Sequence, residues 1–74
     1  MLGKLLKVTM ELNKQNGVVA YMCYQGTKDY VSVTIYDRNI LVYSRNEFVE
    51  NREALCGMLE DVRNMLAVAK GRAE

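Results

Sequence analysis

One apolar arc in the last third of the chain constrains the fold most. On a helical wheel, with about 100° between successive residues, the apolar side chains of this segment fall on one side and most charged side chains on the other. The arc consists of Leu55, Met58, Leu59, Val62, Met65, Leu66 and Ala69. Asn46 or Asn51 can cap the start of such a helix, and Lys70 followed by Gly71 suits its end. The pattern predicts an amphipathic helix over about residues 47–70, which must pack its arc against another apolar surface.

Strict alternation in the middle of the chain predicts that surface. Between residues 29 and 37, Val31, Val33 and Ile35 share one face of an extended strand. Arg38 and Asn39 predict a short turn into a second strand over residues 40–44. A third strand is predicted over residues 18–24, joined to the first through a turn at residues 25–28. The three segments predict an antiparallel meander with one apolar face.

The register of this sheet follows from placing the apolar side chains of all three strands on a common face. A shift by one residue would turn every side chain of a strand to the other face, so this condition selects one alignment. It gives the pairs Cys23–Val31, Tyr21–Val33, Val42–Ile35 and Tyr43–Thr34.

The apolar residues of segment 2–15 fit both the period of a helix and the period of a strand. As a helix, this segment places Lys4, Lys7, Glu11 and Lys14 on one polar stripe, and Asn16-Gly17 ends it. As a strand, its apolar and polar residues alternate, and Asn16-Gly17 becomes a hairpin turn. We favour the helix because Leu, Lys, Met, Glu and Gln have high helix propensity. The expected fold is therefore α+β with the order α-β-β-β-α, a three-stranded antiparallel sheet and both helices on one face; the alternative is a four-stranded meander plus a C-terminal helix.

The length of 74 residues and the even charge balance describe one domain over residues 1–74. Ten Lys and Arg residues stand against nine Asp and Glu residues. We find no pattern of a signal peptide or membrane span, so we expect a cytoplasmic protein. Cys23 and Cys56 lie in apolar surroundings without metal-ligand spacing, which predicts buried free thiols.

The chain contains no histidine, which excludes an imidazole base and the nucleophile pairs that depend on one. Its acidic residues are expected at turns or on a solvated helix face, and Ser32 and Ser44 stand in strands with no base beside them. A lone Gly57 in the C-terminal helix indicates either a close packing contact or no special role. We therefore expect no enzyme, no catalytic, cofactor-binding or metal-binding residue, and no cofactor.

An unusual group of tyrosines is the strongest functional signal. In the expected register, the sheet face turned away from the helices carries Met22, Tyr24, Tyr30, Tyr36, Leu41 and Tyr43. Lys28 and Arg38 stand at the strand ends around this group. Tyrosine is enriched at recognition surfaces, and it also simply favours strands. We interpret these eight residues as a candidate binding surface.

The order of elements carries a resemblance, together with the segments Leu5-Leu6-Lys7-Val8-Thr9-Met10-Glu11-Leu12-Asn13 and Tyr30-Val31-Ser32-Val33-Thr34-Ile35-Tyr36. In this pattern the chain resembles small proteins encoded by phages and other mobile elements, some of which are anti-CRISPR inhibitors. The resemblance implies a non-enzymatic module that binds a bacterial nuclease or nucleoprotein complex stoichiometrically.

The order also resembles the double-stranded RNA-binding domain, which presents lysines at the start of its second helix to phosphates. Here Glu47, Glu50 and Glu53 stand at that position, which disfavours direct nucleic-acid binding. We therefore expect a protein partner. A single-stranded nucleic-acid binder that stacks bases on the tyrosines, and a homodimer formed through them, are the alternatives.

Overall fold

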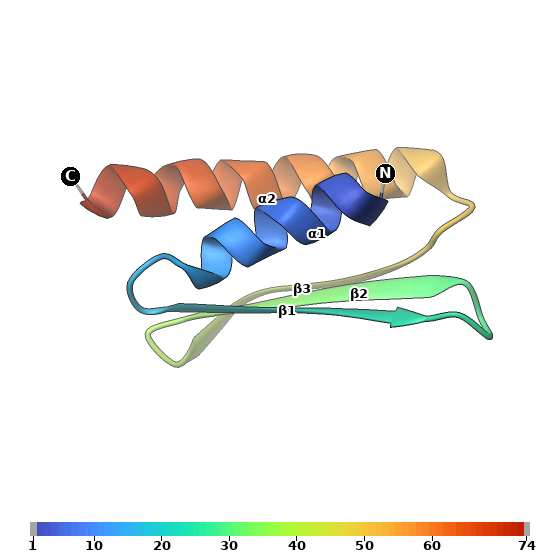
Figure 1. Cartoon of the computed structure of the whole chain (residues 1–74), viewed down its shortest axis with the longest axis horizontal. Helices are drawn as coiled ribbons and strands as arrows, with labels where there is room; N and C mark the ends of the chain where they lie inside the picture. Colours follow the sequence, from blue (N-terminus) through green and yellow to red (C-terminus); the bar gives the residue numbers. More distant parts are fainter. Residues whose placement is uncertain (1, 74) are drawn as a thin grey trace.

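A computed structural model describes residues 2–73 of the chain as two layers (Figure 1). The elements follow in the order α1 (Leu2–Asn13), β1 (Val18–Gln25), β2 (Tyr30–Asp37), β3 (Ile40–Phe48) and α2 (Arg52–Ala73). The strands form one antiparallel sheet in the order β1-β2-β3, and both helices lie on the same face of it. This arrangement confirms the predicted α-β-β-β-α fold.

The first segment is helical, which confirms the preferred reading of residues 2–15. Leu5 and Leu12 are buried on the side of α1 that faces the interior. The hydroxyl of the buried Thr9 donates a hydrogen bond of 2.8 Å to the carbonyl of Leu5, so that its polar atom is satisfied within the helix. Beyond the helix the chain turns at Gly17, whose φ of 82° lies in the left-handed region that glycine adopts without strain.

Asn13, the last residue of α1, joins that helix to the edge of the sheet. Its side-chain amide donates to the carbonyl oxygen of Ala20 over 2.6 Å, and the backbone N–H of Ala20 donates to Asn13 Oδ1 over 2.8 Å. Ala20 lies in β1, an outer strand, and these two backbone groups therefore face away from β2. The asparagine occupies hydrogen-bonding groups that an outer strand would otherwise leave open.

The second helix begins later than predicted. Its first residue is Arg52, because β3 continues to Phe48 and takes Glu47 into the sheet. Asn51 is the cap, and its Oδ1 accepts the N–H of Ala54 over 3.2 Å. The predicted start near residue 47 was wrong because residues 44–47 are polar and read as a solvated helix start.

The core lies between α1, α2 and the Val/Ile face of β2. Val31, Val33 and Ile35 are almost completely buried there, against residues of the predicted arc of α2. Val33 is 0% exposed and Leu59 is 6% exposed. Burial of both residues confirms the predicted core face of the sheet and of α2.

The register between β1 and β2 differs from the predicted one by one residue. Val31 stands opposite Tyr24 rather than Cys23, and Val33 stands opposite Met22 rather than Tyr21. The loop between the strands covers residues 26–29 and includes Asp29 with a φ of 51°, whereas the predicted turn covered residues 25–28. Residues 18–24 are apolar on both faces, so their pattern alone does not decide which face turns inward.

The pairing of β2 with β3 is interrupted by a bulge at Val42. The two-residue turn is as predicted, with positive φ angles of 54° at Arg38 and 68° at Asn39, as in the turns typical of hairpins. Tyr36 pairs with Leu41, but Ile35 pairs with Tyr43, so Val42 is an extra residue on β3. The predicted pairs Val42–Ile35 and Tyr43–Thr34 were wrong, because the bulge turns every later residue of β3 to the other face.

Both cysteines are exposed free thiols, which contradicts their predicted burial. The register shift places Cys23 on the sheet face away from the helices. Cys56 follows the buried Leu55 on α2 and lies on the outer side of that helix.

Candidate protein-binding surface

The sheet divides the predicted binding residues between its two faces. Tyr30, Tyr36 and Leu41 lie on the face away from the helices, as predicted. Met22, Tyr24 and Tyr43 belong to the helix side, and their predicted place was wrong for the reasons of register and bulge given above. Lys28 and Arg38 are exposed in the turns at opposite ends of the sheet.

The face away from the helices carries no charged side chain. We call it the uncharged face, and it consists of Val19, Tyr21, Cys23, Gln25, Tyr30, Ser32, Thr34, Tyr36, Leu41, Ser44, Asn46 and Phe48. Solvated faces of antiparallel sheets normally carry charged and polar residues. Both described helices cover the opposite face (Figure 1), so neither of them covers this surface of aromatic, aliphatic and uncharged polar side chains.

Two aromatic pairs stand at opposite ends of the uncharged face. The rings of Tyr21 and Tyr36 meet edge to face, with centroids 6.1 Å apart. The rings of Tyr30 and Phe48 meet at 5.4 Å. Each pair joins neighbouring strands, and such contacts hold aromatic rings in fixed positions. The face therefore presents two preformed aromatic contact sites.

The first of these ends continues into an aliphatic patch. Val19 and Leu41 flank Tyr21 and Tyr36 from the two outer strands, and Tyr21 is 58% exposed. Sequence reasoning missed Val19, Tyr21 and Phe48. Phe48 was assigned to the helix, while the other two belong to the strand whose facing the apolar pattern does not decide.

Tyr43 takes part in a polar network between β3 and α2. Its hydroxyl donates to Asp61 Oδ2 over 3.0 Å, and the guanidinium of Arg45 donates to the same oxygen and to Glu47, each over 3.0 Å. A Cβ at Gly57 would lie 3.3 Å from a terminal nitrogen of Arg45, so the glycine gives the guanidinium room against the helix. Of the two alternatives for Gly57, this favours the packing contact. The network fastens α2 to the sheet and is turned away from the uncharged face.

Burial and the hydrogen bond to Asp61 raise the pKa of Tyr43 from 10.0 to about 12. A group with a raised pKa in the folded state contributes its full stability below its unfolded pKa and loses it as the pH rises through the folded value. We therefore expect the contribution of this phenol to decline between pH 10.0 and about 12. The difference between phenolate absorbance titrations of the wild type and Tyr43→Phe should have its midpoint near the upper value. A midpoint near 10.0 in folded protein would contradict the described network.

Tyr24 has a separate partner at the far end of β1. Its hydroxyl donates to Asp29 Oδ1 over 2.9 Å, and this hydrogen bond is the main reason that the pKa of Tyr24 is raised. The ring is half exposed on the helix side of the sheet. Tyr24 is therefore an exposed tyrosine outside the uncharged face.

Within residues 2–73, no set of three or more Cys, Asp or Glu side chains is placed to hold a metal ion. The described helices also include none with the length and apolar content needed to cross a bilayer. No family model, curated protein or solved structure matches the chain.

Proposed function

We propose that this chain is a non-enzymatic interaction module that binds a protein partner stoichiometrically through the uncharged face. The observation that carries the proposal is an exposed sheet face with two aromatic pairs and no charge. Depletion of charge together with enrichment of aromatic residues is typical of the centre of protein–protein interfaces.

The same absence of charge favours a protein over a nucleic acid. Nucleic acids are bound through Lys and Arg side chains that neutralise phosphates, also where bases stack on aromatic rings. Lys28 and Arg38 lie in turns at the two ends of the uncharged face, and Arg45 of β3 faces the helix side, where it is paired with Glu47 and Asp61. The basic residues Lys4 and Lys7 belong to α1 on the other side of the sheet. A protein surface with little charge is the complementary partner.

The resemblance to small phage proteins supports one class of partner. Some proteins of that kind are anti-CRISPR inhibitors, which bind a bacterial nuclease complex stoichiometrically and work by occupying a surface rather than by chemistry. A bacterial nuclease complex is therefore the first partner to test.

The experiment uses a matched set of tyrosine variants. Partners are captured on the immobilised chain from bacterial lysate after nuclease treatment, and the affinity of each purified partner is then measured. The double variant Tyr21→Ser with Tyr36→Ser should weaken binding at least about tenfold, because both rings lie centrally in the aromatic end of the face. The control is Tyr24→Ser, which removes an exposed tyrosine from the same strand on the helix side and should change affinity less than about twofold.

Three results would contradict the proposal. Capture that is lost on nuclease treatment, with affinity falling steeply as salt is added, would indicate a single-stranded nucleic-acid binder. Self-association that is abolished by the double variant would indicate a homodimer. An unchanged affinity for every partner, with the fold retained, would remove this face from consideration.

A further inference from the structure

We propose that the free edge of β3, together with the groove beside it, binds an extended peptide segment of a partner by strand addition. The backbone groups of this site belong to Ser44 and Asn46 at the border of the uncharged face, whereas its groove lies on the helix side of the sheet. The proposal is independent of the function proposed above.

The two edges of the sheet differ in their protection. At the β1 edge, the outward N–H and C=O of Ala20 are both bonded to Asn13, and the N–H of Val18 donates to Gln15 in the preceding turn. The first half of β1 therefore has little capacity to receive another strand. The second half of β1 and the edge of β3 are left without such bonds, and β3 is the open edge that borders an apolar recess, at Val42.

The exposed backbone groups of β3 follow from the alternation of an antiparallel ladder. Because Ala20 faces away from β2, its neighbour Tyr21 faces Thr34, and Val33 and Ile35 on β2 then face β3. The ladder partners of these two are Arg45 and Tyr43. Ser44 and Asn46 consequently direct their N–H and C=O groups outward. The side chain-to-backbone hydrogen bonds of residues 2–73 lie in α1, in β1 and at the start of α2, and none reaches β3.

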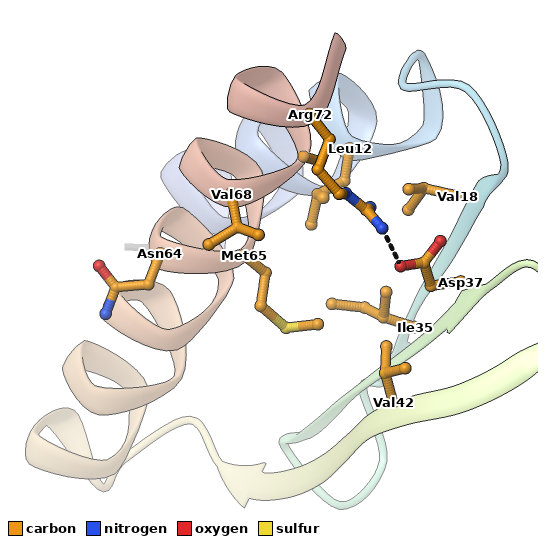
Figure 2. A pocket seen from close by; sticks show the side chains of 10 residues that line it. Leu12, Val18, Ile35, Asp37, Val42, Asn64, Met65, Val68 and Arg72 are labelled. Atoms are coloured by element: carbon orange, nitrogen blue, oxygen red, sulfur yellow. Dashed lines mark hydrogen bonds and ion pairs between the residues drawn. The ribbon is translucent and has the colours of Figure 1, made fainter.

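A groove of about 260 Å³ opens between the sheet and the C-terminal half of α2, at the end of the sheet near the turn of residues 38–39 (Figure 2). Its wall from β3 is Val42, two positions before Ser44, and its floor includes Ile35 of β2 and Val18 of β1. The bulge directs Val42 toward Met65 of α2, and Val68 lies on the opposite wall with 63% of its surface exposed. An ion pair of 2.7 Å between Arg72 and Asp37 stands at the end of the groove near β2. The site thus combines unpaired backbone groups with an apolar recess.

An extended peptide matches both parts of this site. Its backbone supplies donors and acceptors at the spacing of Ser44 and Asn46, and alternate side chains turn toward the helix layer, where the recess accepts an apolar one. The nearby charges of Arg45, Glu47 and Asp61 are engaged with one another. Selection of the peptide is therefore expected by apolar shape rather than by charge.

The probe is a peptide selected from a phage-displayed library of random short sequences on the immobilised full chain. We expect selected peptides with an apolar residue at alternate positions. N-methylation of the amides that face β3 should abolish binding, whereas N-methylation of the amides between them should not, because those face away from the sheet.

Paired variants locate the peptide on the protein. Ser44→Pro removes one outward N–H and should weaken binding at least about tenfold, whereas Ser44→Ala keeps that N–H and should retain affinity. Val68→Lys places a charge in the groove and should also weaken binding at least about tenfold, with Ala67→Lys on the exposed side of the same helix as its control. The Val68 pair tests the groove even where Ser44→Pro does not fold.

Several results would overturn the proposal. These are a library that yields no binding peptide, and a peptide that tolerates both Val68→Lys and Ser44→Pro in folded protein. Peptide binding that is lost only in the double variant Tyr21→Ser with Tyr36→Ser would place the site on the uncharged face instead. Self-association of the free chain that Ser44→Pro abolishes would show that a second copy is the occupant.

Discussion

Leu59→Ala is expected to lower the free energy of unfolding by about 2 to 5 kcal/mol. Leu59 is 6% exposed and belongs to the core formed by α2 and the Val/Ile face of β2. Removing its isobutyl group loses the transfer free energy of the buried carbons and leaves a cavity that the neighbours fill only in part. A domain of 74 residues holds little stability in reserve, so this loss is a large share of the total.

Urea denaturation followed by circular dichroism measures this loss. The matched control is Val68→Ala, which shortens an aliphatic side chain on the same helix where it is 63% exposed. That variant should change the free energy of unfolding by less than about 0.5 kcal/mol. A loss below about 1 kcal/mol for Leu59→Ala would show that another face of α2 packs against the sheet.

Asn13→Ala is expected to cost about 1 to 3 kcal/mol of unfolding free energy. The variant removes the donor to the Ala20 carbonyl and the acceptor of the Ala20 N–H, two contacts of 2.6 and 2.8 Å that join α1 to β1. It also opens the β1 edge, so self-association should increase with protein concentration.

Denaturation and sedimentation measurements test the two effects separately. Asn16→Ala is the control, because Asn16 is an exposed asparagine three positions further along. It should leave both the free energy of unfolding and the sedimentation coefficient close to those of the wild type. Equal losses in the two variants would contradict a specific role for Asn13.

The order of elements could be predicted because α2 and β2 each show one clear periodicity of apolar residues. The apolar residues of α2 recur with the helical period, and Val31, Val33 and Ile35 occupy every second position of β2. Few arrangements bury both of these apolar surfaces. The helix of residues 2–13 was harder, since two periods fit it, and helix propensity decided it correctly. Periodicity and helix propensity are local properties of the sequence, so they can be recognised without knowledge of the tertiary structure.

The candidate binding surface could be predicted only in part, because the strand register decides on which face of the sheet each side chain lies. The apolar residues of β1 occur on both faces, so their pattern does not decide whether Tyr21 or Tyr24 lies on the face away from the helices. The loop between β1 and β2 and the packing of β1 beneath α1 decide it. A bulge leaves no composition signal, so the inward turn of Tyr43 could not be read from the strand pattern. The face away from the helices does carry aromatic residues, but Tyr21 and Phe48 lie there in place of Tyr24 and Tyr43.

The bulge at Val42 has a consequence for how the length of this chain can change. Losing one residue from a strand normally exchanges its inner and outer side chains, which a domain this small does not survive. Val42 is the residue that β3 has in excess of its partner, because Leu41 stands opposite Tyr36 and Tyr43 opposite Ile35. Its deletion would make the ladder regular while keeping both halves of β3 on their present faces, at the expense of one wall of the groove. Related chains are therefore expected to tolerate a one-residue deletion in β3 at this position, and not between residues 43 and 48.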